Sequence, residues 1–389
     1  MRILLLVGSY WDIGGVQEAV DNLAAQFVHR GHAVGIITDR HAGGMVVRAA
    51  PADTGIVTTD IPTQRPLTWR HPERLLGRSR GVVKAEQELA KHIGRFCPNV
   101  ASSHEWLWDR FPGIVRACQA VGVPLVHTLY DTCGQGCLGK RALKCLKFAD
   151  TLVAVSVATR ADFMGLLTGH PGINLIYPGV DIAAADAAAS RRADRQYIFS
   201  AGRLLFAHKA MDNLIVAFSL IAARYPSIDL LVAGDGPDRH ELATAIAHNG
   251  LSGRVQLLGT VSREELWGLH KGALLFVLPS RMSEGLGMVF LEAMACGKAV
   301  IASASGGVPE IVLPGETGYL LSDEDPRTLA SAMSDLLDRP NTCAQMGWNG
   351  RRLVRSRHTW ASAADQYLDL YVDIPRNRWA SLAQPVSQT

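Results

Sequence analysis

The fold is decided by the stretch Leu274–Gly297, which reads LLFVLPSRMSEGLGMVFLEAMACG. Its first part, Leu274–Leu278, is an unbroken apolar run of the kind found in strands buried on both faces of a parallel sheet. A loop containing Gly285 and Gly287 follows, and a helical pattern begins there. Glycines let backbone N–H groups approach a ligand closely, and the positive end of a helix dipole favours a phosphate. The stretch therefore predicts a strand, a loop and a helix that together bind an anionic ligand.

The same alternation of short apolar runs and helical patterns continues on both sides of this stretch. Around it we expect strands at Tyr197–Ala201, Asp229–Ala233, Val255–Leu258, Ala299–Ala302 and Tyr319–Leu321. In the first half we expect strands at Arg2–Val7, Ala33–Thr38, Val100–His104, Pro124–Tyr130, Thr151–Ser156 and Asn174–Tyr177. Apolar runs separated by helices are typical of parallel sheets covered on both faces. The predicted fold is α/β, with two doubly wound, Rossmann-like domains facing a central cleft, where ligands bind at the carboxyl ends of the strands.

A polar segment separates the two alternations. Residues 183–196 include three arginines and no aromatic residue, so we expect a linker there. The predicted organisation is an N-terminal domain over 1–182, the linker over 183–196, and a C-terminal domain over 197–358. A last helix over 359–374 crosses back onto the first domain, and 375–389 form a loose tail.

The composition is that of a globular protein with a large core, since 48% of the 389 residues are hydrophobic and 19% are charged. The formal net charge of +3, from 39 basic and 36 acidic residues, is too small to favour a nucleic-acid partner. The apolar run near the N-terminus is too short for a signal peptide, and no run of about 18 apolar residues could span a membrane. The seven scattered cysteines fit a reducing compartment better than a disulfide framework. We therefore expect a cytoplasmic protein.

Two carboxylates stand eight positions apart in the deciding stretch, at Glu284 and Glu292. On a helical path this spacing spans roughly 12 Å. Hydrolases that cleave glycosidic bonds keep their paired carboxyl groups closer, under about 10 Å. The spacing suits the two ends of one extended ligand instead, with a sugar at Glu284 and a ribose at Glu292.

Two cations follow the first strand of the second alternation, in the run AGRLLFAHK that ends at Lys209. Arg203 and Lys209 lie in one strand-to-helix loop, so both can reach a ligand at the strand ends. A leaving diphosphate gains negative charge as its bond breaks, and fixed cations stabilise that charge most in the transition state. With no Asp-rich motif nearby, the two cations can take the place of a metal.

A glycine pair, Gly14 and Gly15, follows the first strand and precedes a helix. Such a pair lets a phosphate or sugar pack against the backbone at a helix N-terminus. The surrounding residues do not form G-x-G-x-x-G, which disfavours a dinucleotide-dependent oxidoreductase.

On these motifs, the sequence resembles glycosyltransferase family 4, a group of retaining enzymes with the two-domain GT-B fold. The resemblance covers nearly the whole chain and is most specific over Ala201–Leu321. It implies a hexosyltransferase that moves a hexose-type sugar from a nucleotide-diphosphate sugar to a glycan or lipid-linked acceptor, in cell-surface polysaccharide or glycolipid biosynthesis. It also implies that neither a cofactor nor a metal is needed.

The resemblance assigns roles to residues of this chain. Glu284 matches the glutamate that contacts the donor sugar near the reacting carbon, and Arg203 and Lys209 match the diphosphate-binding pair; these three are the predicted catalytic residues. Thr260 and Val261 belong to the segment whose backbone reads the base. The predicted donor-binding residues are Gly14, Gly15, Thr260, Val261, Gly285, Leu286, Gly287 and Glu292.

One departure from the family lies in the first domain. Family members carry His in a Thr-x-His-Asp run near the donor sugar, whereas this chain has Tyr130 before Asp131. A phenol can donate a hydrogen bond but is neutral at pH 7, so a role that needs imidazole is lost at this position. His104 and His127 are nearby alternatives for the sugar or acceptor side of the site.

Two weaker features bear on a possible metal site and on possible contact with a membrane. Cys133, Cys137 and Cys145 lack the paired spacing and the fourth ligand of a zinc site. Two basic, partly amphipathic stretches, Arg65–Arg80 and Lys140–Lys147, predict either a solvated face or peripheral contact with an anionic membrane, as in relatives that glycosylate lipid-linked acceptors.

Two functions remain as alternatives to transfer. One is a nucleotide-sugar isomerase or hydrolase on the same scaffold, and the other is a binding protein inactivated by the change at Tyr130. The first would release free or altered sugar without an acceptor, and the second would bind a donor without turnover.

Overall fold

The computed structural model describes residues 1–7, 15–39, 57–61, 80–104, 111–132, 140–167, 172–191 and 194–374. The chain divides into two compact units, which we call unit 1 and unit 2. Unit 1 contains Met1–Val155, Thr159–Tyr177 and the C-terminal part from Trp360. Unit 2 contains Ser156–Ala158 and Pro178–Thr359.

The sheet of unit 1 has seven parallel strands among the described residues, in the order β3-β2-β1-β4-β5-β6-β7. Successive strands run outward from β1 to one edge and then from β4 to the other, as in a doubly wound sheet. The strands are β1 Arg2–Val7, β2 Ala33–Asp39, β3 Val57–Ile61, β4 Val100–Ser103, β5 Leu125–Leu129, β6 Thr151–Ala154 and β7 Ile173–Leu175.

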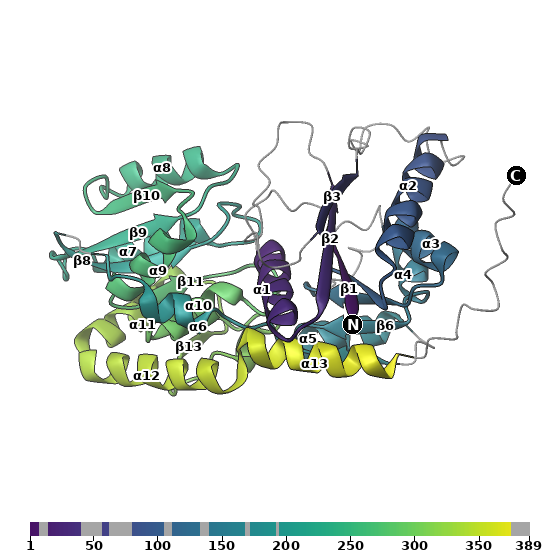
Figure 1. The fold of residues 1–389 in the computed structure, drawn as a ribbon. Helices are drawn as coiled ribbons and strands as arrows, with labels where there is room; N and C mark the ends of the chain where they lie inside the picture. The colour runs from purple at the N-terminus through teal and green to yellow at the C-terminus, as the bar shows by residue number, and fades with distance from the viewer. Residues whose placement is uncertain are drawn as a thin grey trace, which may run out of the picture. The chain divides into compact units, whose positions relative to one another are not determined.

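Helices cover both faces of this sheet (Figure 1). On one face, α1 packs against α13, and Arg30 donates to Asp365 at 2.7 Å across that contact. On the other face, α2, α3 and α4 pack together. The helices are α1 Gly15–His29, α2 Arg80–Phe96, α3 Phe111–Val121, α4 Lys140–Leu146, α5 Val157–Leu166 and α13 Trp360–Asp373.

The sheet of unit 2 has six parallel strands within the described part of the chain, in the order β10-β9-β8-β11-β12-β13. This order is again doubly wound, with its reversal between β8 and β11. The strands are β8 Gln196–Ala201, β9 Ile228–Ala233, β10 Val255–Gly259, β11 Phe276–Leu278, β12 Val300–Ser303 and β13 Gly318–Leu321.

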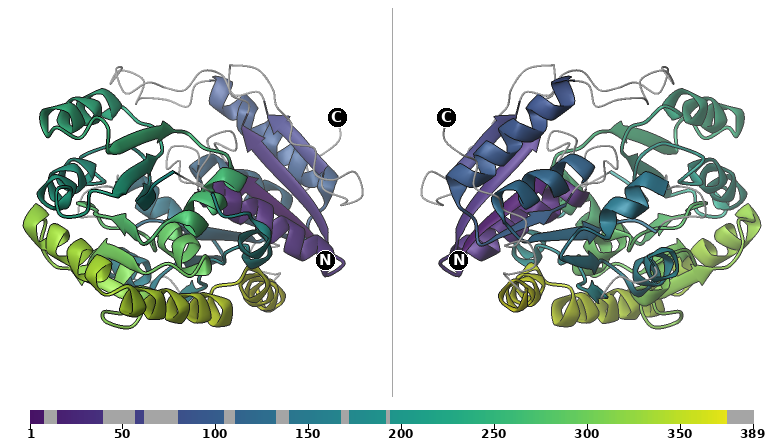
Figure 2. Two further views of the ribbon diagram at one scale, coloured as in Figure 1. Left: turned by 90° about the vertical axis from the view of Figure 1, so that its left-hand side faces the viewer. Right: turned by 90° about the vertical axis from the view of Figure 1, so that its right-hand side faces the viewer.

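The helices of unit 2 also form two layers, which can be followed in Figure 2. One layer contains α7, α8 and α11, and the other contains α6, α9, α10 and α12. Their bounds are α6 Ile182–Ala187, α7 Met211–Ile221, α8 Arg239–His248, α9 Arg263–Gly272, α10 Met288–Ala295, α11 Pro326–Asp338 and α12 Pro340–Arg357, with a short 3-10 helix, η2, at Val308–Glu310.

Burial on both faces explains why the strands are continuous apolar runs. All six residues of β9 are buried, and β8 is buried from its second residue on. Each buried Val, Leu or Ile side chain contributes about 1.5–3 kcal/mol through removal of apolar surface from water. The predicted strands are all present, with ends shifted by at most two residues, and the predicted α/β fold class is confirmed.

The structure differs from the sequence-based description in two places. Strand β3 was not predicted, because VTTDI lacks a continuous apolar run and pairs on one side only, with β2 at the sheet edge. The segment predicted as a linker, 183–196, lies wholly within unit 2 and begins inside helix α6. Asp181 caps this helix by accepting from Ala184 N at 2.9 Å, and alanines favour helix even where large apolar residues are missing.

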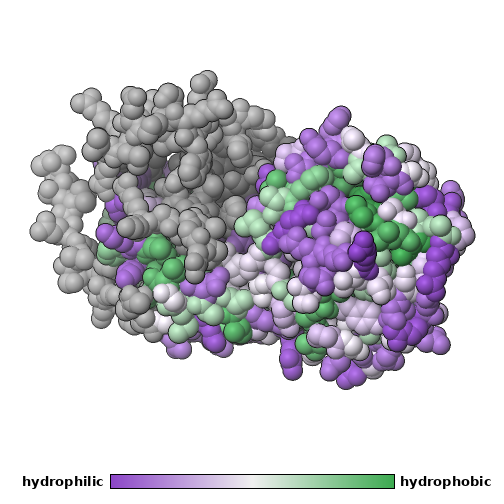
Figure 3. All heavy atoms as spheres, turned by 180° about the vertical axis from the view of Figure 1, so that it is seen from behind, coloured by the Kyte–Doolittle hydropathy of each residue, from purple (hydrophilic) through white to green (hydrophobic). Residues whose placement is uncertain are grey.

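The face of the molecule drawn in Figure 3 is mixed in polarity where residues are described. Figure 3 shows hydrophobic side chains in small groups bordered by hydrophilic ones. No helix in the described part of the chain combines the length and apolar character needed to cross a bilayer.

Candidate active site

The candidate site of unit 2 lies where its strand order reverses, at the carboxyl ends of β8 and β11. Helices that follow these two strands go to opposite faces of the sheet, and in α/β proteins ligands typically bind at such a point. The loops after the two strands are joined by backbone hydrogen bonds, from Ala210 N to Pro279 O at 3.1 Å and from Arg281 N to His208 O at 2.8 Å. The two motifs that the sequence singled out separately therefore form one structural unit.

Lys209 and Glu284 are paired across these loops. The Lys209 Nζ forms a short ion pair with Glu284 Oε1, and Ser280 Oγ donates to the same oxygen at 2.6 Å. Both charged side chains are mostly buried, with 18% and 16% of their surface exposed. A charge pair in such surroundings is screened less by water than a surface pair, so the attraction between the two charges is stronger.

Arg281 joins the two loops through hydrogen bonds of its side chain. The sequence did not predict this role. Its guanidinium donates to both carboxylate oxygens of Asp212, at 2.7 and 2.9 Å, and to Phe206 O at 2.8 Å. A bidentate arginine–carboxylate pair sets both distance and orientation. Arg281 thereby connects the loop that carries Glu284 to the loop that carries Lys209 and to the helix α7 that follows it.

Arg203 is exposed and forms no ion pair with any described residue. Its loop rests on two glycines of the segment after β9, Gly234 and Gly236. A Cβ at Gly234 would lie 2.0 Å from Gly202 O, and a Cβ at Gly236 would lie 2.2 Å from Leu204 O. These glycines allow the close backbone approach on either side of Arg203. The sequence analysis did not identify them, and their Gly-x-Gly spacing after a strand is the signal that could have found them.

A third loop, after β12, supports Glu284. Gly307 N donates to Glu284 O at 2.9 Å, and a Cβ at Gly306 would lie 2.0 Å from that same carbonyl oxygen. Gly306 also has a φ of +55°, in the left-handed region that favours glycine. The Gly306–Gly307 pair was likewise not identified from sequence.

The predicted donor-binding residues after Glu284 shape the start of α10. Leu286 is buried, and Gly287 has a φ of +86° and directly precedes the helix. The helix begins at Met288, so Glu284 stands in the loop and only Glu292 stands on the helix. The continuous helical path assumed between the two glutamates is therefore wrong, because the left-handed turn at Gly287 separates them.

Glu292 is only 4% exposed and lies in the second turn of α10. Arg263 Nη1 donates to its Oε1 at 2.7 Å. Burial raises the pKa of the Glu292 carboxyl, and the positive charge of Arg263 opposes that rise. Arg263 was not identified from sequence, where it reads as an ordinary charged residue near a helix start.

Thr260 and Val261 lie between β10 and α9, next to Arg263. Gly259 O accepts from Gly234 N at 2.8 Å, so this segment adjoins the glycine loop under Arg203. Thr260 is exposed and Val261 is half-buried. The structure thus brings the predicted base-reading segment to the same sheet edge as the predicted diphosphate-binding loop.

The corresponding edge of unit 1 lies at the carboxyl ends of β1 and β4. Gly15 is the first residue of α1, and Gly14 lies outside the described residues. His104 directly follows β4, and Tyr130 and Asp131, both half-buried, follow β5.

His104 and Tyr130 form a pair. His104 Nδ1 and Tyr130 Oη lie 2.7 Å apart, and Ser102 Oγ lies 3.0 Å from the other ring nitrogen. His104 is fully buried, and burial lowers its pKa to about 3. His127 is also buried, its ring 4.2 Å from that of Phe111, and burial lowers its pKa to about 3. Both imidazoles are therefore neutral at pH 7.

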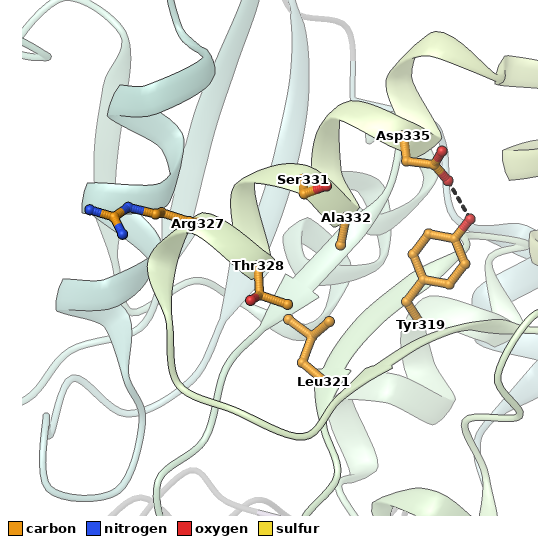
Figure 4. A pocket seen from close by; sticks show the side chains of 7 residues that line it. All are labelled: Tyr319, Leu321, Arg327, Thr328, Ser331, Ala332 and Asp335. Atoms are coloured by element: carbon orange, nitrogen blue, oxygen red, sulfur yellow. Dashed lines mark hydrogen bonds between the residues drawn. The ribbon is translucent and has the colours of Figure 1, made fainter.

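Other features lie apart from these residues. The described residues contain no group of three or more His, Cys, Asp and Glu side chains placed to hold a metal ion. Of the cysteines considered for zinc, Cys133 and Cys137 lie outside the described residues, and Cys145 is half-buried and is not part of a disulfide between described residues. A hollow of about 520 Å³ at the outer edge of unit 2, between β13 and α11, contains none of the predicted site residues. Figure 4 shows the hydrogen bond that the Tyr319 hydroxyl donates to Asp335 in this hollow, and the Arg327 side chain points away from these two residues.

Comparison with known proteins identifies the family. The model described as glycosyl transferases group 1 matches residues 182–353, and the model described as glycosyltransferase family 4 matches residues 13–184. A D-inositol 3-phosphate glycosyltransferase of Mycolicibacterium smegmatis is 31% identical, over 92% of this chain and 86% of that protein. A GDP-mannose-dependent monoacylated alpha-(1-6)-phosphatidylinositol monomannoside mannosyltransferase of Corynebacterium glutamicum is 30% identical, over 70% of this chain and 69% of that protein.

Solved structures share the fold at lower identity. Anabaena HepE in complex with UDP and glucose has a TM-score of 0.80 at 20% identity, over 96% of this chain and 99% of that one. Sucrose-phosphate synthase of Thermosynechococcus elongatus has a TM-score of 0.80 at 23% identity, over 96% and 98%.

Proposed function

Because the chain belongs to glycosyltransferase family 4 and is a glycosyltransferase with the GT-B fold, we propose that it transfers a hexose-type sugar from a nucleoside-diphosphate sugar with retention of configuration. One observation carries the proposal. The loops after β8 and β11 are joined at the point where the strand order of unit 2 reverses, and Lys209 and Glu284 form an ion pair across them. In the proposed site, Lys209 is the cation for a phosphate, and Glu284 beside it is the carboxylate for sugar hydroxyls.

The charges suit a departing nucleoside diphosphate. Arg203 is an exposed guanidinium on a loop held by two glycines, and Lys209 stands in the same loop. As the bond to the sugar breaks, negative charge grows on the leaving phosphate oxygen, and positioned cations stabilise that charge without reorganising. Glu284 is held by Lys209 and Ser280, so its second oxygen can accept from donor-sugar hydroxyls.

Retention follows if the acceptor attacks from the face that the phosphate leaves. The acceptor hydroxyl oxygen forms the new bond to the anomeric carbon, the bond from that carbon to the phosphate oxygen breaks, and the acceptor proton passes to the leaving phosphate. Neither carboxylate needs to act as a nucleophile in this route. The chain binds and orients the reactants and stabilises the charge of the leaving group.

We propose that this reaction requires neither a metal nor another cofactor. The support is the pair of cations, since Arg203 and Lys209 supply the positive charge at the diphosphate. A test is transfer in the presence of excess chelator, which we expect to leave the rate unchanged. A rate that falls with chelator and returns with Mg²⁺ would overturn this part of the proposal.

The relatives suggest the substrates to try first. Those compared above are named for GDP-mannose or D-inositol 3-phosphate, and the HepE structure holds UDP and glucose. We propose a glycolipid or phosphorylated polyol as acceptor, in the formation of a cell-surface glycan or glycolipid. Exposed Lys144, Lys147 and Phe148 at the end of α4 support peripheral contact with the cytoplasmic face of an anionic membrane. The other predicted basic stretch, at 65–80, lies almost entirely outside the described residues.

The experiment combines binding and turnover. Thermal shift with nucleoside diphosphates and their sugars identifies the donor, because a ligand at a hundred times its dissociation constant stabilises by about 2.7 kcal/mol. Incubation of that donor with D-inositol 3-phosphate or with phosphatidylinositol mannosides in vesicles then tests transfer, and NMR of the product gives the anomeric configuration.

Three outcomes contradict the proposal in different ways. An inverted product would exclude retention. Free sugar or an altered nucleotide-sugar formed without acceptor would indicate the hydrolase or isomerase alternative. Donor binding without turnover on any acceptor would indicate a binding protein.

A further inference from the structure

The surroundings of Glu292 contain two groups to which neither the resemblance nor the proposed function gives a role. One is Arg263, the first residue of α9, and the other is His270, near the end of the same helix. Arg263 donates to Glu292 Oε1 at 2.7 Å, and His270 Nε2 lies 3.9 Å from Glu292 Oε2. The two oxygens of one buried carboxylate thus each face a different side chain of α9.

Arg263 is held in place by its neighbours. Its guanidinium lies 4.9 Å from the centre of the Trp267 ring, one turn along the helix. Ser262 caps the helix directly before it, accepting from Glu265 N at 3.2 Å, while Glu265 accepts from Ser262 N at 2.8 Å. This capping box fixes where the helix begins and hence where the Arg263 side chain starts.

His270 is fully buried, with both ring nitrogens unpaired in the described structure. Its ring lies between those of Phe199 and Phe276, at 5.0 and 5.1 Å. A buried polar atom without a partner costs free energy, so such an arrangement calls for an explanation. The distance of 3.9 Å to Glu292 is too long for a hydrogen bond, but a displacement of roughly 1 Å would make one.

The charge state of Glu292 decides what it can bind. A carboxylate accepts hydrogen bonds at both oxygens, so it can take two neighbouring ribose hydroxyls, whereas a protonated carboxyl must use one oxygen as a donor. Burial favours the protonated form, and the cation of Arg263 is the opposing influence. Without Arg263, the buried Glu292 would lose its counter-charge.

On this basis we propose that Arg263 and His270 are positioning residues that keep Glu292 an ionised, oriented acceptor, and that these three residues make the protein select ribonucleotides over 2′-deoxyribonucleotides. The inference rests on the proposed function, since it takes Glu292 as the ribose-binding residue. Arg263 lies two positions after Val261, the second of the predicted base-reading residues, with the capping residue Ser262 between them.

The test measures dissociation constants of UDP and GDP and of their 2′-deoxy forms by calorimetry. We expect the wild type to bind the ribose form of its preferred nucleotide roughly 10- to 100-fold more tightly than the deoxy form, as is typical of a hydrogen bond to a charged group. Arg263→Met should weaken binding of the ribose form by a similar factor, leave the deoxy form nearly unchanged and bring the ratio close to one. Raising the pH should restore part of the loss, because Glu292 then ionises.

A double-mutant cycle separates action through Glu292 from direct contact with the ligand. If Arg263 acts through Glu292, Arg263→Met has no further effect in a Glu292→Gln background. This double variant also buries no unpaired charge, so it tests the inference even if Arg263→Met alone fails to fold. His270→Phe should reduce the ribose preference several-fold, and His270→Asn should restore part of it because its amide can donate.

The outcomes distinguish the inference from the proposed function. Failure of the wild type to bind any nucleoside diphosphate would overturn both. Tight binding by the wild type with an unchanged ribose preference in Arg263→Met, or additive losses in the cycle, would overturn the inference alone. A loss of thermal stability without a change in the ratio would show a merely structural role.

Discussion

The two strand-end edges of the molecule carry different kinds of polar side chain. In unit 2, Arg203, Lys209 and Glu284 are charged and stand in loops that hold one another by hydrogen bonds. In unit 1, His104 and Tyr130 are paired with each other, and burial keeps the imidazole neutral. From this difference we expect that, in the proposed reaction, the electrostatic stabilisation comes from unit 2 and that the polar groups of unit 1 are neutral.

The largest expected effect comes from removing a charge in unit 2. Lys209→Met should lower kcat by about a hundredfold or more, because it removes a cation at the leaving phosphate. It also frees Glu284 from its ion pair. Steady-state kinetics with the identified donor provides the measurement. A near-normal kcat in a folded variant would remove Lys209 from the mechanism and would weaken the contrast between the units.

The next effect tests whether the loops of unit 2 must be packed as tightly as they are. Gly306→Ala places a Cβ 2.0 Å from Glu284 O and at a φ of +55°, so the loop with Glu284 must shift. A shift of about 1 Å near the reacting atoms can cost up to a hundredfold in rate. We expect kcat to fall at least tenfold and Tm to fall by several degrees.

Gly253→Ala is the matched control, since its Cβ would meet no atom within 4 Å. Kinetics and thermal unfolding should be close to wild type in this control. If Gly306→Ala behaved like Gly253→Ala, the close packing behind Glu284 would have no part in catalysis.

The loss of stability at acid pH tests whether the buried histidines are neutral in the folded protein. Burial lowers the pKa of His104, His127 and His270 to about 3, below the ordinary histidine value of 6.5. Between these values the unfolded chain binds more protons than the folded one, so stability is lost as the pH falls below 6.5. At pH 5.5 each such histidine lowers the free energy of unfolding by about 1 kcal/mol.

His104→Asn should therefore reduce the stability difference between pH 7.5 and 5.5 by about that amount, as measured by urea unfolding. His248→Asn, at an exposed position on α8, is the control and should leave the difference unchanged. An unaltered pH dependence in His104→Asn would mean that His104 is accessible to protons in the folded protein.

The smallest expected effect on rate comes from the Tyr130 hydroxyl. Tyr130→Phe removes the partner of His104 Nδ1, which should cost about 1–3 kcal/mol of stability because that nitrogen is buried. Since no charge is lost, we expect kcat to change less than tenfold, and Tyr130→His to remain active. A hundredfold loss in Tyr130→Phe would place an essential group in unit 1 and break the comparison.

The order of elements was readable from the sequence because strands buried on both faces must be apolar throughout. The runs at β8, β9 and β11 each predicted a strand, and a loop with two glycines before a helix predicted an anion site. Strand β3 escaped prediction because an edge strand needs no continuous apolar run. Helix α6 was not predicted either, because the alanines of its segment form no periodic pattern of apolar and polar residues.

The sequence alone determined which residue types could serve the site and that each follows a strand. The tertiary structure decided how they meet: Lys209 contacts Glu284 across 75 positions of chain, and Arg263 contacts Glu292 across 29. Gly234 and Gly306 matter only because another backbone lies against them. Local patterns fix the elements, whereas distances between side chains depend on how the sheet order brings separate loops together.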